Sequence, residues 1–168
     1  MVRLAVARRE KKSDGSTSDG TCHYGPHLIK RRRLQQGGEH YDKGFALYDP
    51  SEHRPLATRF GQDIQVAILS YRSLALWLLG FPEAALKDAE NAVKYGRDTG
   101  QAASLMFVLY VTAILHILCG NYSVATAQAQ ELFLVADEKG ALLWKASGMV
   151  FEGCVLASTG KSSEAIES

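Results

Sequence analysis

The feature that most constrains the fold is a turn motif that recurs every 40 residues. A glycine, a short polar or proline-containing stretch and then an alanine occur together at Gly80, Gly120 and Gly160. Between those turns, Gly100 and Gly140 keep the same interval. Self-similarity at a period of about 20 to 50 residues is the signature of one supersecondary unit that is stacked repeatedly. The sequence therefore predicts a repeat protein, and every other motif has to be judged against this period.

The segments between these glycines alternate in hydrophobic character. Residues 64–79, 102–119 and 141–159 are apolar on nearly all sides, which predicts helices that are covered on more than one face. Residues 82–94 and 122–139 have one apolar stripe opposite charged or polar side chains, which predicts helices with one wet face. Pro82 fits the first turn of such a helix, where its missing N–H costs little. The predicted fold class is all-α, an antiparallel helix-pair solenoid.

Small residues recur seven positions before and five positions after each turn glycine. Two helices joined by a turn can approach to about 8 to 10 Å only where the side chains at their crossing are small. We interpret these positions as structural and not catalytic. The predicted structural repeat positions are Ser73, Gly80, Ala85, Ala113, Gly120, Ala125, Gly153, Gly160 and Ala165.

Charge and composition divide the chain into three parts. Residues 1–36 hold nine Lys or Arg against three acids, whereas the remainder holds ten against fifteen. That first part lacks an apolar period and predicts a basic, poorly ordered tail, with a short helix near residues 28–36. Residues 37–62 predict a short helix over residues 38–48, ended by Asp49-Pro50, followed by an ordered connector. The repeats follow as residues 63–99, 101–140 and 141–168, with Asp63 as the predicted N-cap of their first helix.

The last repeat is truncated in this pattern. Residues 162–168 begin a sixth helix of the repeat region, which we expect to leave the preceding apolar helix partly uncovered. A solenoid needs a polar cap at each end, so the isolated chain is predicted to be prone to association.

Three motifs could carry chemistry, and each has a simpler structural interpretation. Gly160-Lys161-Ser162 lacks the glycine that a phosphate-binding loop needs five residues earlier, and it coincides with the third repeat turn. Cys22, His23 and His27 could bind a metal, but no second cluster completes a zinc site. His116 stands where the other repeats have leucine, so a core histidine is favoured over a catalytic base. We predict no catalytic residue, no metal and no cofactor.

Cysteine usage and hydropathy bear on the compartment. The three cysteines are odd in number and widely spaced, which is typical of free thiols in a reducing cytosol. The apolar piece near the start, residues 4–7, is too short for a signal peptide, and the longest apolar run falls short of the ~20 residues that cross a bilayer. A soluble, cytoplasmic protein without membrane contact is predicted.

The repeat positions resemble those of the tetratricopeptide repeat. That pattern places a small residue in the first helix, a glycine-containing turn, and small or apolar residues in the second helix. The matching residues are Ser73, Gly80, Ala85 and Ala92, then Ala113, Gly120, Tyr122, Ala125 and Leu132, and then Gly153, Gly160 and Ala165. The interval of 40 exceeds the usual ~34 residues and is similar to the longer variant of MalT-type transcription regulators.

A second resemblance is narrower. The stretch over residues 48–82 is similar to the C-terminal repeat region of large bacterial proteins that join a nucleotide cyclase domain, an AAA-like ATPase domain and tetratricopeptide repeats. The residues that carry it are Tyr48-Asp49-Pro50, His53-Arg54-Pro55-Leu56-Ala57, Phe60-Gly61-Gln62-Asp63 and Leu76-Trp77-Leu78-Leu79-Gly80-Phe81-Pro82. The resemblance covers residues 38–168 and implies a fragment whose catalytic domains would lie upstream.

Two functions follow as expectations. The first is a non-catalytic interaction and regulatory segment of such a signalling protein, which would bind a protein, a peptide or the upstream domains of its own parent chain. The alternative is nucleic-acid binding through the basic residues 30–33, with the repeats as a scaffold. We consider nucleic acid the less favoured partner. Phosphate-driven binding would weaken steeply with salt and would be lost on deletion of residues 1–36.

Overall fold

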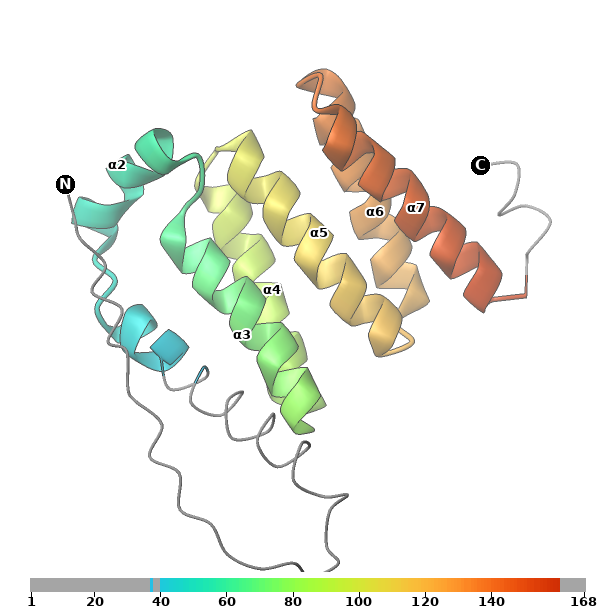
Figure 1. Cartoon of the computed structure of the whole chain (residues 1–168), viewed down its shortest axis with the longest axis horizontal. Helices are drawn as coiled ribbons and strands as arrows, with labels where there is room; N and C mark the ends of the chain where they lie inside the picture. Colours follow the sequence, from blue (N-terminus) through green and yellow to red (C-terminus); the bar gives the residue numbers. More distant parts are fainter. Residues whose placement is uncertain (1–36, 38–39, 161–168) are drawn as a thin grey trace, which may run out of the picture.

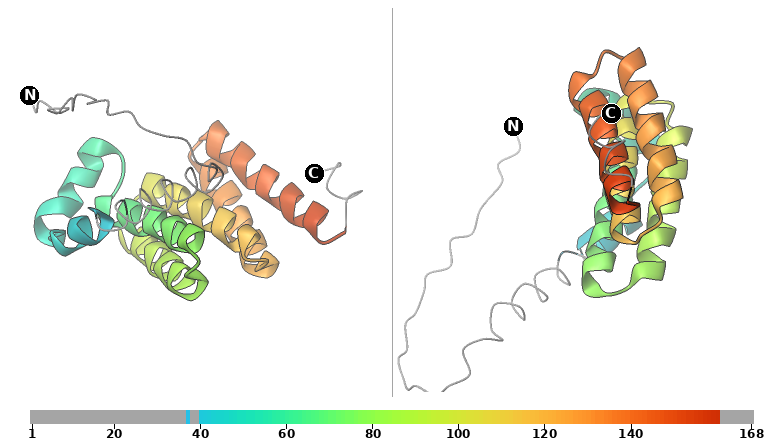
Figure 2. Two further views of the ribbon diagram at one scale, coloured as in Figure 1. Left: turned by 60° about the horizontal axis from the view of Figure 1, so that its bottom comes forward. Right: turned by 90° about the vertical axis from the view of Figure 1, so that its right-hand side faces the viewer.

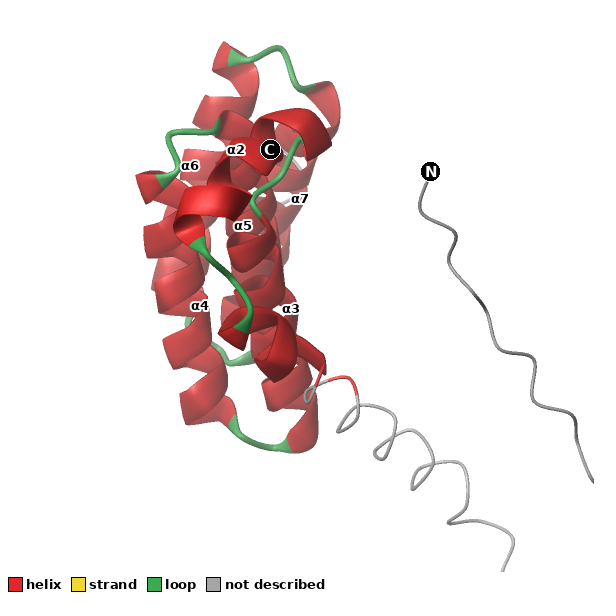
Figure 3. Ribbon diagram, turned by 90° about the vertical axis from the view of Figure 1, so that its left-hand side faces the viewer, coloured by secondary structure: helices red, strands yellow, loops and turns green. Residues whose placement is uncertain are grey.

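The computed structural model describes residue 37 and residues 40–160, and every regular element in this part of the chain is a helix. After a short helical segment at residues 40–46 come α2 (Pro50–Phe60), α3 (Ile64–Leu79), α4 (Pro82–Asp98), α5 (Ala102–Leu118), α6 (Tyr122–Glu138) and α7 (Leu142–Ser158) (Figure 1). The predicted all-α class is thus confirmed for the described residues (Figure 3).

The side chain of Asp63 fixes where the repeat region begins. Its Oδ1 accepts the backbone N–H groups of Gln65 at 2.9 Å and Val66 at 3.1 Å, as an N-cap does. Its own N–H donates to Ser104 Oγ at 2.9 Å, and Tyr48 donates to Oδ2 at 3.0 Å. Asp63 therefore begins α3 and joins it to α5 and to the segment before α2. The predicted cap is present and is almost completely buried.

The turns at Gly80 and Gly120 share one geometry. Gly80 has φ 90° and Gly120 has φ 74°, a left-handed conformation that residues with a Cβ adopt only at a cost. The residue after each glycine donates its N–H back into the helix, Phe81 to the Leu76 carbonyl at 2.9 Å and Asn121 to the His116 carbonyl at 2.8 Å. This is the bonding pattern of a Schellman C-cap. The recurring glycines thus end helices at equal intervals.

Helix packing follows the order of the chain. α3 packs on α4, α5 on α6, and α6 also on α7, while α5 contacts α3, α4 and α7. Figure 2 shows the helices following one another along the long axis of the molecule, with α7 at one end of the described part. Side chains from α3 to α7 form the main core. Its fully buried members include Val66, Leu69, Ala92, Val108, Leu109, Ala113, Ala129, Leu132 and Ala136.

The segment predicted as an ordered connector is helical. α2 begins at Pro50, where proline is tolerated in the first turn, and Asp49 caps it by accepting the Ser51 N–H at 2.8 Å. Pro55 lies inside this helix and removes one backbone donor, yet the helix continues to a left-handed Gly61. The preceding helical segment ends at residue 46, two residues earlier than predicted. Pro55 was given too much weight as a helix breaker.

Several expectations fall on residues outside the described part of the chain. These are the basic tail over residues 1–36 with Cys22, His23 and His27, the Lys161-Ser162 end of the phosphate-loop candidate, and the sixth repeat helix with Ala165. Within the described residues, no helix is long and apolar enough to cross a membrane.

Candidate interaction surfaces

The predicted crossing positions lie at the contact between paired helices. Ser73 and Ala85 in α3 and α4, like Ala113 and Ala125 in α5 and α6, have no exposed surface. Gly80, Gly120 and Gly160 occupy the turns with positive φ. Gly153 differs, because it lies on α7 and is half-exposed. All these residues are therefore structural in position.

In each of the helix pairs α3–α4 and α5–α6, two polar side chains at equivalent positions connect the two helices. Arg72 and Asp88 lie eight residues before and after Gly80, and Thr112 and Gln128 lie eight residues before and after Gly120. Thr112 Oγ1 is 3.0 Å from Gln128 Oε1, and both residues are buried. Sequence reasoning missed these pairs because the residue types differ between repeats. The 40-residue interval was the signal that could have found them.

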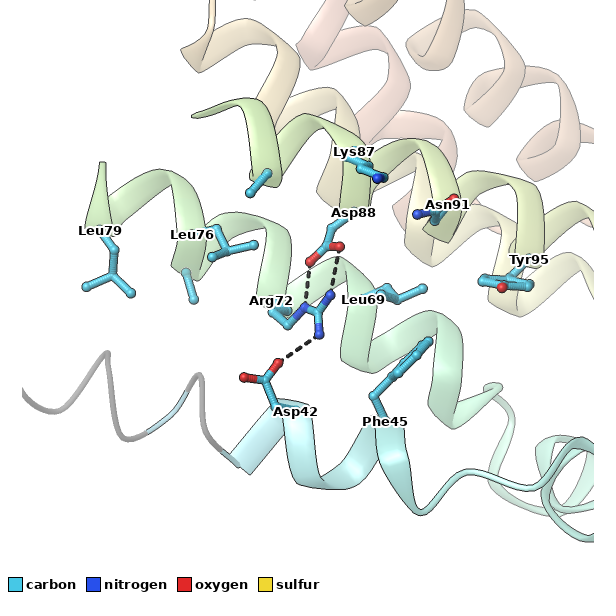
Figure 4. Close-up of a pocket in the computed structure, with 12 residues that line it drawn as sticks. Asp42, Phe45, Leu69, Arg72, Leu76, Leu79, Lys87, Asp88, Asn91 and Tyr95 are labelled. Atoms are coloured by element: carbon cyan, nitrogen blue, oxygen red, sulfur yellow. Dashed lines mark hydrogen bonds and ion pairs between the residues drawn. The ribbon is translucent and has the colours of Figure 1, made fainter. Parts of the chain in front are cut away.

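Arg72 is the centre of an ionic network on the α3–α4 side of the molecule (Figure 4). Its Nε and Nη2 donate to the two carboxylate oxygens of Asp88 at 2.6 and 2.9 Å, and Nη1 donates to Asp42 at 2.8 Å. The guanidinium also lies 5.6 Å from the ring centroid of Phe45. The hydrogen bonds to Asp88 raise the pKa of Arg72 in spite of its partial burial. The network therefore fastens residues 40–46 to α3 and α4.

A groove of about 520 Å³ surrounds this network (Figure 4). It is lined by Asp42, Phe45, Leu69, Arg72, Ala75, Leu76, Leu79, Ala84, Lys87, Asp88, Asn91 and Tyr95. Both carboxylates in it, Asp42 and Asp88, bind Arg72, so each opposes a cation and neither is placed beside a nucleophile. The polar groups at the centre of the groove thus satisfy one another, and we interpret it as a structural clasp.

His116 is buried in α5 with 5% of its surface exposed. Its Nδ1 has no hydrogen-bond partner among the described residues. Burial lowers the pKa of its imidazole, and the charge of Glu90 opposes this shift to a smaller extent. A neutral imidazole without an orienting partner is poorly suited to proton transfer. The core position agrees with the leucines that stand at its repeat equivalents, Leu76 and Leu156.

One face of α7 is apolar and open to solvent along the whole helix. Leu142 and Leu143 are 78% and 76% exposed, Met149 is 43% exposed and Val150 is 60% exposed. The spacing of these residues defines a single helical stripe. We call it the α7 stripe; it consists of Leu142, Leu143, Ala146, Met149, Val150, Gly153, Cys154 and Ala157.

Three positions of the α7 stripe, those of Ala146, Met149 and Gly153, correspond to buried residues in both preceding repeats. Met149 corresponds to Leu109 in α5 and Leu69 in α3, which are 0% and 2% exposed. Ala146 corresponds to Met106 and Val66, which are also buried. In those repeats α4 and α6 pack against α3 and α5. The α7 stripe therefore has the composition of a packed helix face, and no described element covers it.

A depression of about 450 Å³ between α6 and α7 adjoins the α7 stripe. It is lined by Gln130, Phe133, Leu134, Met149 and Glu152. Leu134 is 66% exposed, so α6 adds apolar surface at this edge. Lys145 binds Asp137 at 2.6 Å and lies 5.0 Å from the ring centroid of Phe133. The open face is thus flanked by charged side chains on the side of α6.

Metal ligation has no support in the described residues, where no group of three or more His, Cys, Asp or Glu could hold an ion. The comparisons with known proteins find no match: no family model fits the chain, and no curated protein or solved structure is similar to it.

Proposed function

We propose that this chain is a non-catalytic helical-repeat segment that binds a helix of a protein partner. Its architecture in this proposal is a tetratricopeptide-like solenoid with a 40-residue period. The observation that carries the proposal is the α7 stripe, a row of apolar residues open to solvent whose positions at Ala146, Met149 and Gly153 correspond to buried residues of α3 and α5.

The repeat geometry supports the solenoid. Equivalent turns have the same left-handed glycine and the same capping bond, and small residues lie at equivalent helix crossings. The polar pairs Arg72–Asp88 and Thr112–Gln128 add a third feature with the same period. The resemblance over residues 48–82 extends the proposal to the parent protein. We place the chain in the regulatory part of a bacterial signalling protein of the nucleotide cyclase and ATPase type.

The chemistry of the expected partner follows from the repeats. α4 and α6 present Ala85, Ala89, Ala125 and Ala129, all buried, to the helices that they cover. A helix that covers α7 should likewise run antiparallel to it, with small apolar residues on the contact face. Burial of a Leu, Val or Met side chain contributes about 1.5 to 3 kcal/mol, and the α7 stripe has four such large residues, Leu142, Leu143, Met149 and Val150. This surface can therefore drive association without any charged anchor.

The test is a chain in which a copy of residues 121–139 follows Gly160 in place of residues 161–168. By the 40-residue period, this copy places its alanines against α7. The matched control carries the same copy with the equivalents of Ala125 and Ala129 changed to Glu. The intact copy should raise the melting temperature by several degrees, since about 1 kcal/mol shifts Tm by ~2 to 4 °C in a chain of this size. Equal melting temperatures for the copy and its Glu control would refute a helix-binding face.

A further inference from the structure

We propose that the helix bound by the α7 stripe is α7 of a second copy of this chain, in an antiparallel arrangement with a twofold axis between Met149 and Val150. This inference rests on the proposed function and names its partner. Three observations support it: side-chain size, register and charge.

Side-chain size changes along the α7 stripe. Its first half has the large residues Leu142 and Leu143, and its second half has the small residues Gly153 and Ala157, with Met149 and Val150 between them. An antiparallel pair places the large half of one helix against the small half of the other. Packing of large against small residues lets two helix backbones approach closely. A parallel pair would place leucines against leucines and leave a gap beside Gly153.

A twofold axis between Met149 and Val150 also gives a consistent register. In that register Leu142 lies opposite Ala157 of the second copy, and Ala146 lies opposite its Gly153. An interface of this kind is self-complementary, because each contact occurs twice by symmetry. The smallest side chains thus coincide near the middle of each half, where the helices need to be closest.

The charges on α7 are compatible with this arrangement. Lys145 and Glu152 are the charged residues of α7, and they lie seven positions apart on the flank next to α6. This twofold axis places the α6-facing flanks of the two α7 helices on the same side of the dimer. Lys145 of one copy then lies opposite residue 154 of the other copy, two residues away from Glu152. Opposite charges at an interface rim favour the correct register and disfavour others. In a parallel pair, Lys145 would lie at the same height as Lys145 of the second copy, and Glu152 at the same height as its Glu152, so like charges would be level with each other.

A single helix pair buries less than the ~800 Å² per partner of a standard interface, so the dimer should be weak and dependent on concentration.

The experiment uses the full chain with Cys22, Cys119 and Cys154 changed to Ala. Two single-cysteine variants are made in this background, Ala146→Cys and Gly153→Cys, and a third, Ala127→Cys, places a cysteine on the exposed side of α6 as a control. Helix content and melting curves of each variant confirm that it is folded. Disulfide formation under mild oxidation is followed for each variant alone and for equimolar mixtures.

The antiparallel dimer predicts that the mixture of Ala146→Cys and Gly153→Cys forms disulfide dimers at least 10-fold faster than either variant alone or mixed with the Ala127→Cys control. Equal rates in all samples would overturn the proposal, and so would faster cross-linking of Ala146→Cys with itself, which indicates a parallel pair. Attaching the copy of residues 121–139 should block the cross-link. A third outcome separates the two proposals. If the attached helix stabilises the chain but the cysteine variants without it form no cross-link, the helix-binding function stands and a second molecule of this chain is refuted as the partner.

Discussion

Replacement of His116 by Leu is expected to stabilise the protein and to reduce its sensitivity to acid. His116 is 5% exposed, and its Nδ1 lacks a hydrogen-bond partner within the described structure. A buried polar group without a partner costs about 1 to 3 kcal/mol. Leucine occupies the equivalent positions 76 and 156, so the backbone geometry accommodates it. We expect a gain of about 1 to 2 kcal/mol in the free energy of unfolding at pH 7.5, because repacking offsets part of the full penalty.

The effect should grow as the pH falls. Burial lowers the pKa of His116 in the folded protein below its ordinary value of 6.5. Below pH 6.5 the unfolded chain binds a proton at this site that the folded chain excludes. The pH-dependent part of the free energy of unfolding that comes from His116 is therefore fully present above pH 6.5. It is lost as the pH falls toward the pKa of His116 in the folded protein. A leucine side chain has no proton to bind, so H116L should lose less stability between pH 7.5 and 5.5 than the wild type.

The assay is urea unfolding at pH 7.5 and 5.5, followed by circular dichroism. His40→Gln serves as the matched control, because His40 is exposed and its replacement also removes one histidine. The reasoning is refuted if H116L and the wild type lose equal stability on acidification, or if H116L is less stable than the wild type at pH 5.5.

Three further substitutions test the packing. Ala125→Leu adds volume at a crossing with no exposed surface and should cost about 1 to 3 kcal/mol in a thermal melt; an unchanged Tm would show that the crossing lies elsewhere. Gly148→Ala places a Cβ 2.9 Å from the Ala129 carbonyl oxygen and should lower stability by about 1 kcal/mol, since overpacking exceeds the gain in helix propensity; a more stable variant would contradict this contact. Asp88→Asn removes the charge that Arg72 binds through two hydrogen bonds and should cost about 1 to 2 kcal/mol by urea unfolding, whereas a neutral result would mean that Asp42 alone satisfies the guanidinium.

The sequence predicted the helix boundaries well where one residue decided them. Gly80 and Gly120 require a left-handed turn, and Asp63 caps α3 with its side chain, so local chemistry was sufficient there. α2 was missed because the segment with Pro55 was interpreted as an ordered connector, while the cap at Asp49 and the tolerance of proline near a helix start favoured a helix.

The surfaces were less predictable than the turns. The network of Arg72, Asp88 and Asp42 depends on residues 16 and 30 positions apart, and such spacing has no local signature. The apolar composition of α7 predicted a helix with more than one covered face, and the expectation that this helix would be partly uncovered agrees with its exposed residues. The partner that we propose for it rests on side-chain size along the stripe, and that property became interpretable only after the exposed positions were known.

The most direct test of the account is sedimentation velocity of the full chain over a range of concentrations. The wild type should shift reversibly from a species of 18.4 kDa to one of twice that mass. Val150→Glu places a charge at the proposed twofold axis and should remain monomeric with unchanged helix content. Leu78→Glu, at a position 58% exposed and outside the α7 stripe, should dimerise as the wild type does. A wild type that stays monomeric at every concentration, or a Val150→Glu variant that dimerises equally well, would contradict the central claim.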